Sequence, residues 1–509
     1  MLTVRRSITS NLRQMDLRLK SLSLLVTLLL FSLASAQTAP AERKEGDLKF
    51  EPFTIPFEGQ NVTAELGRLV VRENRSNRKT NLIELAFVRL KSTAENPGYP
   101  VVYLDGGPGS SAINIARAPD YMRAFMKLRE VGDVILLDQR GVGRSKPNLS
   151  RLSTEALPPD VFADSDLMLR TFRERTLAAV TYFRGQGIDI QAYNTLESAN
   201  DVDDLRQALG AQKLNLVGFS YGTHLGLACI RYHGANLNRV VLIGTEGPDH
   251  TNKLPFTSDV SLKRLATLAA AAPELEGKVP DLVGILTEVL TRFAKEPVTV
   301  QITDQRTKKP VEAKVGKSGL QFLIMRDLGD TNDLPIFPAW FYTMHQGDYS
   351  ILARFVERRY NQYGAGISVM PIVMDAASGT SKQRMAKIEA EAKTALLGSM
   401  VNFPFPGIDD AVGSPDLGDN FRSAIRTNVP TLFISGTLDN NTPPFQADEV
   451  RRTFRTSTHL VVENAGHESM LVGERVQQTI VEYLRGADVA KAKLALPPLK
   501  FNKIPTAKN

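Results

Sequence analysis

The chain is poor in the residues that build disulfides and metal sites. Its 509 residues include a single cysteine, Cys229, so no internal disulfide can form. Only six histidines are present, and no two of them form a His-x-x-x-His pair. The sequence also lacks a Gly-x-x-x-x-Gly-Lys-Ser/Thr phosphate-binding loop. These absences argue against zinc hydrolysis and nucleotide chemistry, and we expect neither a metal nor a cofactor.

Charge of one sign is not in large excess either. The chain has 62 Lys and Arg against 55 Asp and Glu, a net charge of +7. Residues 1–36 hold five basic residues and one acidic residue, so the charge without them is +3. No basic stripe with interleaved aromatic residues occurs, and we expect no nucleic-acid partner. With 42% hydrophobic and 23% charged residues, the composition is typical of a globular protein with a large core.

The first 36 residues have the pattern of a signal peptide. Arg18 and Lys20 precede an apolar run, Leu22 to Leu33, and Ala34-Ser-Ala36 is a small-residue cleavage site. The run is short for a transmembrane helix, although an uncleaved anchor is the alternative. We therefore expect a signal peptide over 1–36, export to the periplasm or medium, and no stable membrane insertion after cleavage. Residues 37–60 are expected to form a flexible N-terminal lead-in.

The segment from Leu214 to His224 contains the most informative motif, Gly218-x-Ser220-x-Gly222, directly after an apolar stretch. A strand that turns sharply into a helix places the central serine in a strained conformation and exposes its hydroxyl, while the glycines remove colliding side chains. The alternative is a helix start packed tightly on a strand. The motif predicts Ser220 as a nucleophile.

A glycine-rich loop follows the strand-like run Val101 to Leu104. This loop, Asp105-Gly-Gly-Pro-Gly109, is suited to presenting backbone N–H groups, although an ordinary Gly-Pro turn is the alternative. We predict an oxyanion hole built by the N–H groups of Gly107 and Tyr221. Asp138 and Arg140, after the next strand, are expected to form a charge-assisted pair that braces this loop.

Two polar residues farther along the chain complete the candidate site. Asp439 follows the strand-like run from Thr431 to Ser435, and His467 follows the run from His459 to Glu463. The carboxyl ends of parallel strands meet at one edge of a sheet, so we expect Ser220, Asp439 and His467 to converge there. The order Ser, Asp, His along the chain fits a triad in which the histidine takes the serine proton.

Four motifs together resemble the prolyl and tripeptidyl aminopeptidases of the α/β-hydrolase fold, over about residues 65 to 486. They are Gly106-Gly-Pro-Gly109, Asp138-Gln-Arg-Gly-Val-Gly-Arg-Ser145, Gly218-Phe-Ser-Tyr-Gly-Thr223 and Gly436-Thr-Leu-Asp-Asn-Asn-Thr-Pro443. Ser-Tyr-Gly-Thr around the serine is closer to the tripeptidyl branch. The chain departs from the family in having Asp105 where iminopeptidases have histidine, and it lacks paired cysteines at 369–375.

The expected architecture is an α/β-hydrolase fold with a mostly parallel central sheet flanked by helices and a mainly helical cap inserted before the acid-bearing strand. The core is expected over 61–248 and 420–488, the cap over 249–419, and a C-terminal tail over 489–509. A cap of this kind excludes water and shapes the substrate sites.

Substrate recognition is harder to predict because it depends on the cap. An aminopeptidase needs an anionic group for the substrate ammonium, and Glu246 is the leading candidate because it follows a core strand; Asp375 and Glu357 are further possibilities. Trp340, Phe341 and Tyr342 either line an apolar pocket or belong to the cap core.

The resemblance and the motifs favour an exported serine exopeptidase that releases single residues or short N-terminal fragments, such as tripeptides, through an acyl-enzyme. Its expected partner is a short peptide with a free N-terminus; the oligomeric state is left open. The alternatives are an esterase or amidase acting on a small acyl substrate, and a catalytically inactive binding protein of the same fold.

Overall fold

The computed structural model describes residues 43–153 and 155–505. The signal peptide expected over 1–36 and the first part of the lead-in lie outside these residues. The elements below belong to the unit Glu45–Asn509.

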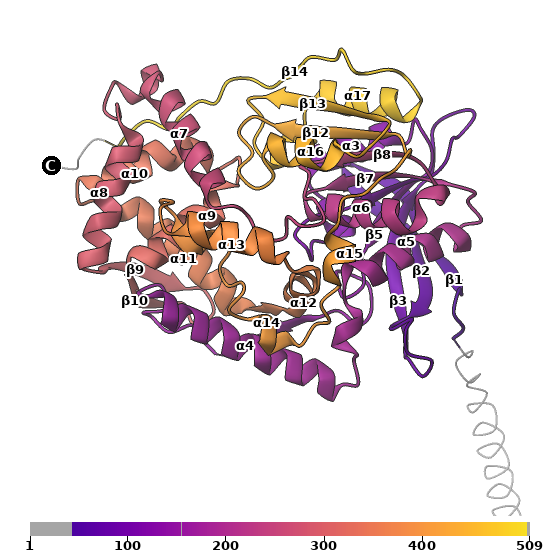
Figure 1. Cartoon of the computed structure of the whole chain (residues 1–509), viewed down its shortest axis with the longest axis horizontal. Helices are drawn as coiled ribbons and strands as arrows, with labels where there is room; N and C mark the ends of the chain where they lie inside the picture. The colour runs from indigo at the N-terminus through magenta and orange to yellow at the C-terminus, as the bar shows by residue number, and fades with distance from the viewer. Residues whose placement is uncertain (1–42, 154, 506–509) are drawn as a thin grey trace, which may run out of the picture. The chain divides into compact units, whose positions relative to one another are not determined.

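Ten strands form one sheet through the core (Figure 1). In the order of the sheet they are β1 (Leu48–Phe57), β2 (Gln60–Arg72), β3 (Leu82–Leu90), β5 (Val134–Asp138), β4 (Val101–Leu104), β7 (Leu214–Phe219), β8 (Leu237–Ile243), β12 (Thr431–Gly436), β13 (Ser457–Glu463) and β14 (Leu494–Ala495). The first four of these pair antiparallel, and from β5 onward all neighbouring pairs are parallel. The expected mostly parallel sheet is confirmed.

Helices cover both faces of this sheet. They are α2 (Ala112–Ile115), α3 (Pro119–Leu128), α5 (Thr195–Ala208), α6 (Tyr221–His233), α16 (Pro444–Arg451) and α17 (Glu474–Leu484), with short 3-10 turns η1 (Ile190–Ala192), η2 (Gly234–Asn236) and η6 (Glu468–Met470). Alternate residues of each strand face opposite sides. Val101 and Tyr103 therefore pack with α3 and α17, whereas Val102 and Leu104 pack with α5 and α6.

The cap is inserted between β8 and β12, as expected. Its helices are α7 (Phe256–Ala270), α8 (Leu282–Lys295), α9 (Lys317–Leu328), α10 (Phe337–His345), α11 (Ser350–Ala365), α12 (Val369–Ser378), α13 (Lys382–Ala392), α14 (Asp409–Val412) and α15 (Gly418–Arg422), with 3-10 turns η3 (Pro273–Leu275), η4 (Leu334–Ile336) and η5 (Gly398–Val401). An antiparallel hairpin, β9 (Val298–Asp304) and β10 (Lys309–Val315), interrupts the helices. The cap has its own hydrophobic core.

Part of the cap comes from before the serine motif, a region that the sequence assigned to the core. Helix α4 (Ser165–Gly185) starts in the cap core, where Met168 is buried, and ends against the main sheet, where Phe183 is buried. Strand β6 (Ser150–Leu152) pairs with β11 (Gly366–Ser368) of the cap. Helix α4 therefore connects the cap to the core sheet, along the lower edge of Figure 1.

The prediction of a flexible lead-in over 37–60 is wrong from Leu48 onward, where β1 begins. This strand lies at the edge of the sheet and is mostly exposed, so it shows no hydrophobic alternation. It also contains Pro52 and Pro56, which an edge strand tolerates because one side of its backbone has no partner strand.

The described part of the expected C-terminal tail, up to residue 505, packs against the cap. After β14 it runs back toward the cap, as Figure 1 shows, and buries Phe501 and Ile504 in the cap core. The Asn502 N–H donates to the Pro335 carbonyl oxygen at 2.9 Å. This segment thus joins the last core strand to the cap.

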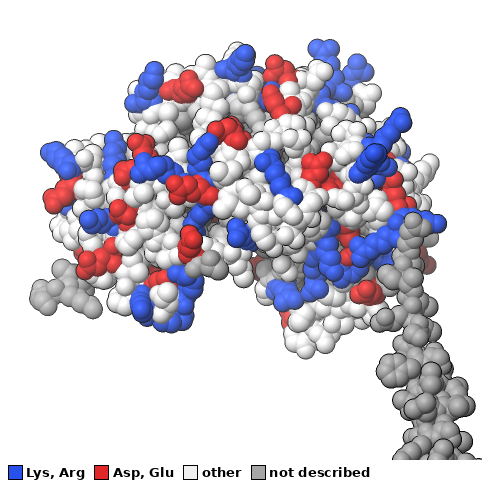
Figure 2. All heavy atoms as spheres, turned by 90° about the horizontal axis from the view of Figure 1, so that it is seen from below, with Lys and Arg blue, Asp and Glu red and all other residues white. Residues whose placement is uncertain are grey.

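The described part of the chain contains no helix long and apolar enough to cross a membrane. Within it, no group of three His, Cys, Asp or Glu side chains is arranged to hold a metal ion. On the face shown in Figure 2, Lys and Arg side chains lie among Asp and Glu side chains.

Candidate active site

Ser220 lies at the turn between β7 and α6 with backbone angles φ 53° and ψ −125°. A positive φ is unfavourable for a residue other than glycine and costs about 1–3 kcal/mol, so the surrounding structure must hold it. The Ser220 N–H donates to the Ile243 carbonyl oxygen on β8 at 2.9 Å. A Cβ at position 222 would overlap the carbonyl oxygen of Leu104, so Gly222 allows α6 to approach β4. The predicted strand-turn-helix geometry is present.

The structure brings Ser220, His467 and Asp439 together at the carboxyl ends of β7, β13 and β12. Ser220 Oγ lies 2.9 Å from His467 Nε2, and His467 Nδ1 lies 3.0 Å from both carboxylate oxygens of Asp439. When Nδ1 donates to Asp439, Nε2 is free to accept the serine proton. His467 is 5% exposed and Asp439 3% exposed, so water has little access to the pair.

The carboxylate of Asp439 is held by its own loop. The N–H groups of Asn441 and Thr442 donate to Oδ1 at 2.8 and 2.9 Å, and the Thr442 hydroxyl donates to Oδ2 at 2.6 Å. Burial opposes the charge of Asp439, but His467 and these hydrogen bonds outweigh it and lower the pKa. The role of Thr442 was missed by sequence analysis, although an Asp followed three residues later by Thr is a recognisable turn signal.

The pKa of His467 is raised, whereas that of Asp439 is lowered. Burial of the imidazole lowers this pKa, but the charge of Asp439 and its hydrogen bond raise it above the ordinary value. A raised pKa makes Nε2 a better proton acceptor. The pair is therefore arranged for general-base chemistry on Ser220.

Of the two predicted oxyanion donors, Tyr221 directly follows the serine in the chain and Gly107 lines the same cavity as Ser220. A Cβ on Gly106, the neighbour of Gly107, would lie 2.8 Å from the Ser220 Cβ. Tyr221 is the first residue of α6, where backbone N–H groups have no acceptor within the helix. Its phenol is buried and lies 2.9 Å from Thr195 Oγ1, which fixes the start of the helix.

The expected pairing of Asp138 with Arg140 is wrong. Arg140 Nε and Nη2 each donate to Asp201 on α5 at 2.7 Å. Strand β5 ends at Asp138, so Arg140 lies in the turn that follows it. Asp138 instead accepts hydrogen bonds from Ser111 Oγ at 2.6 Å and from the Arg144 N–H at 2.8 Å, so it still braces the glycine-rich loop. Arg140 is 0% exposed and cannot touch a substrate.

A cavity of about 660 Å³ lies over Ser220 between core and cap. Four of the rings that line it come from separate cap segments and contact one another with centroids 5.1 to 6.3 Å apart: Phe172, Phe322, Tyr363 and Phe403. Sequence analysis missed Phe172 because it assigned α4 to the core.

The aromatic cluster that the sequence singled out lies elsewhere. Trp340 and Phe341 are buried in the cap core, and Trp340 stacks on Phe355 with ring centroids 3.9 Å apart. Of the two interpretations left open, these residues are core rather than pocket lining.

Two carboxyl groups face the cavity: Glu246, which follows β8, and Asp375 on α12. Among the described residues, neither side chain has a hydrogen-bond or ion-pair partner. Burial raises the pKa of Glu246 to about 6, against the opposing effects of Lys253, His467 and Arg384. Burial, reinforced by the charge of Glu246, raises the pKa of Asp375 well above its usual range.

Glu357, the third acidic candidate, is used elsewhere. Its Oε2 accepts a hydrogen bond from the Thr303 N–H at 2.8 Å, on the β9–β10 hairpin. The structure therefore groups Glu246 and Asp375 with Ser220 and leaves Glu357 outside the cavity.

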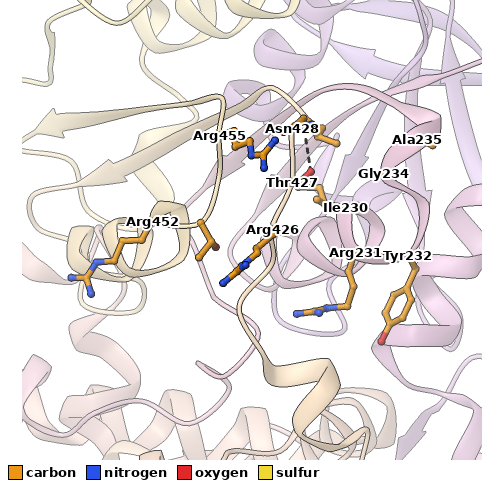
Figure 3. A pocket seen from close by; sticks show the side chains of 12 residues that line it. Ile230, Arg231, Tyr232, Gly234, Ala235, Arg426, Thr427, Asn428, Arg452 and Arg455 are labelled. Carbon is orange, nitrogen blue, oxygen red and sulfur yellow. Dashed lines mark hydrogen bonds between the residues drawn. The ribbon is translucent and has the colours of Figure 1, made fainter.

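A second, shallower hollow of about 920 Å³ lies on the core surface and is lined by Arg231, Arg426, Arg452 and Arg455 together with Tyr232. Figure 3 shows that the side chain of Arg452 points away from those of Arg231 and Arg426. The guanidinium groups thus do not converge on one point, and the hollow does not contain Ser220.

Comparison with known proteins agrees with the fold. Residues 99–281 match a family described as the alpha/beta hydrolase fold, and residues 415–493 match a family described as TAP-like protein. These matches, the strand order and the serine turn define a protein of the α/β-hydrolase fold. Within that fold, the matched TAP-like segment and the relatives below agree with the resemblance to tripeptidyl aminopeptidases that the motifs indicated.

The relatives share limited identity with the chain. A tripeptidyl aminopeptidase of Streptomyces lividans is 30% identical over 194 residues, which cover 36% of this chain and 33% of the relative. The serine protease Hip1 of Mycobacterium tuberculosis is 27% identical over 197 residues, 36% of either chain. The chain thus matches about a third of the length of each relative. A solved esterase from Thermogutta terrifontis aligns with a TM-score of 0.35 and 17% identity, covering 82% of this chain and 98% of that one.

Proposed function

We propose that the protein is an exported serine aminopeptidase that removes single residues or short fragments from the free N-terminus of small peptides. The observation that carries the proposal is the carboxyl group of Glu246, 7% exposed and without a hydrogen-bond partner among the described residues, in the same cavity as Ser220. A buried carboxylate is costly unless it meets a cation. The ammonium of a bound peptide supplies that cation.

The acidic side of the cavity suits a cationic ligand, because Asp375 adds a second carboxyl group to that of Glu246. Three basic side chains, Lys253, Arg175 and Arg326, also line the cavity. The charge of Lys253 lowers the pKa of both acids, yet burial keeps both raised. An incoming ammonium would stabilise both ionised carboxylates, so its binding is coupled to the loss of their protons.

In the proposed reaction, Ser220 Oγ attacks the carbonyl carbon while its proton passes to His467 Nε2. The developing oxyanion accepts hydrogen bonds from the Tyr221 and Gly107 N–H groups. His467 then gives the proton to the departing amine, and the peptide bond breaks to leave an ester on Ser220. Water, deprotonated by His467, hydrolyses that ester and restores the serine. The lowered pKa of Asp439 keeps its carboxylate charged opposite the imidazolium.

The names of the relatives support a peptidase, because one is a tripeptidyl aminopeptidase and another a serine protease. Export is supported by the signal-peptide pattern of residues 1–36. An esterase is the second candidate, favoured by the ring-lined part of the cavity, which would accept an apolar acyl group as readily as a side chain.

The test compares a free tripeptide anilide, its N-acetylated form and a simple aryl ester. Acetylation removes the ammonium and leaves the carboxylates unpaired, so we expect kcat/KM to fall about 30- to 150-fold. Equal rates on both peptides together with far faster ester cleavage would favour the esterase. Failure of a fluorophosphonate to label Ser220 would instead indicate an inactive binding protein.

A further inference from the structure

One loop of the cap, residues 329–333 between α9 and η4, contacts both core loops that carry Asp439 and His467. The Thr331 N–H and hydroxyl each donate to Glu468 Oε2 at 3.0 Å, and Glu468 is the neighbour of His467. We call residues 329–333 the cap loop. Thr331 and Glu468 do not line the cavity over Ser220, whereas Asn441, which Gly329 faces, does.

These contacts are tight because glycines face the cap loop or belong to it. A Cβ on Gly466, the residue before His467, would overlap Thr331 Oγ1. A Cβ on Gly329 would overlap the side-chain amide of Asn441, and the backbone N–H of Asn441 donates to the carboxylate of Asp439. Gly329 has an ordinary φ of −81° and Gly466 is not among the residues with positive φ, so space and not backbone strain excludes a side chain at either position.

The cap loop is itself held by the cap. Arg358 on α11 donates to Asp327 Oδ1 and to Asp333 Oδ2, both at 2.6 Å, and Arg359 also pairs with Asp327. These ion pairs lie at either end of the loop. A shift of the cap would therefore be transmitted to Thr331 rather than absorbed by a slack segment.

We propose that the cap loop is a positioning element for the triad. Thr331 holds Glu468 and with it the loop of His467, while Gly329 supports the loop of Asp439 through Asn441, so a seated cap sets the distance between base and nucleophile. This role is independent of whether the substrate is a peptide or an ester. It therefore goes beyond the proposed function.

The first test is a rescue experiment on the full chain, with an aryl ester as substrate so that a failure of the aminopeptidase proposal does not obscure it. Gly466→Ala should displace the His467 loop and lower kcat about 10- to 100-fold with little change in KM. Thr331→Ala removes the overlapping oxygen. The double variant should therefore be at least about fivefold faster than Gly466→Ala alone.

Gly185→Ala is the matched control because nothing lies within 4 Å of the added Cβ, and it should retain wild-type kcat. If the ester is not turned over, the rate at which a fluorophosphonate labels Ser220 replaces kcat. Wild-type kcat in Gly466→Ala, or an equal loss with and without Thr331→Ala, would overturn the proposal.

The second test separates positioning from packing by the pH profile. Burial lowers the pKa of His467, and the charges of Asp439 and, after it, Glu468 raise it. Glu468→Gln should therefore move the acid limb of kcat/KM to lower pH and also lower kcat. Thr331→Val removes a hydrogen bond but no charge, so it should lower kcat and leave the acid limb in place. The positioning role of the cap loop would be contradicted if Glu468→Gln left the acid limb of the kcat/KM profile at the same pH, or if Thr331→Val left kcat unchanged.

Discussion

Replacing Glu246 by glutamine should weaken the preference for a free N-terminus and increase the stability of the fold above pH 6. Glutamine keeps the shape of the side chain but cannot offer a negative charge to a substrate ammonium. The preference for a free over an N-acetylated tripeptide anilide, about 30- to 150-fold in wild type, should fall to a few-fold. The aryl ester, which has no ammonium, should be cleaved at nearly the wild-type rate.

The stability effect follows from the pKa of the buried carboxyl group. This pKa is about 6 in the folded protein and has an ordinary value of 4.5, so the folded state holds the proton more tightly than the unfolded chain. Wild type therefore loses stability as the pH rises from 4.5 to 6, by about 2 kcal/mol in total. Glutamine avoids this loss, so Glu246→Gln should be more stable above pH 6 and nearly equal to wild type at pH 4.

The measurement is denaturant unfolding of both proteins at pH 8 and pH 4, with the substrate comparison at pH 8. Glu389→Gln is the matched control because Glu389 is exposed on α13, and it should change neither property. An equal stability difference at both pH values would refute the pKa reasoning. An unaltered preference for the free amine would reject Glu246 as the anchor and leave the aminopeptidase proposal standing.

Ser220→Ala should lower kcat at least about a thousandfold and abolish fluorophosphonate labelling. Thermal unfolding should change little; substantial residual turnover would exclude Ser220 as the nucleophile. Arg140→Met should destabilise the fold by about 3–5 kcal/mol, because Asp201 and the carbonyls of Glu73 and Ala192 lose a buried donor. Urea unfolding measures this, and an unchanged midpoint would contradict it. The protein recovered from its native host should begin near Gln37, and N-terminal sequencing that finds residues 1–36 intact would argue for the anchor.

The triad could be predicted from the sequence because each member follows a strand that local pattern reveals. Gly218 and Gly222 mark the serine turn because only glycine permits the backbone approach there. Asp439 and His467 lie just past β12 and β13, whose carboxyl ends meet Ser220 in any parallel sheet of this order. Local chemistry and sheet geometry were sufficient for these three positions.

Side-chain pairings between distant segments could not be predicted in the same way. Arg140 binds Asp201, which lies 61 residues later on α5, and no pattern near Asp138 indicates this. Phe172 reaches the cavity because α4 begins in the cap core before it returns to the sheet. Strand β1 was missed because an exposed edge strand does not need alternating hydrophobic residues.

The contrast between local sequence patterns and contacts between distant segments also explains why the chemistry is easier to infer than the substrate. The three residues proposed to act on the carbonyl all follow core strands, so their convergence is built into the sheet. The proposed recognition site combines Glu246, which follows a core strand, with Asp375 on cap helix α12 and rings from four cap segments. These groups meet only because the cap packs over the sheet, which depends on contacts between distant residues. A change in cap packing can therefore alter substrate choice while Ser220, His467 and Asp439 keep their geometry. The exception is a change that displaces the cap loop, because that loop contacts the loops of Asp439 and His467.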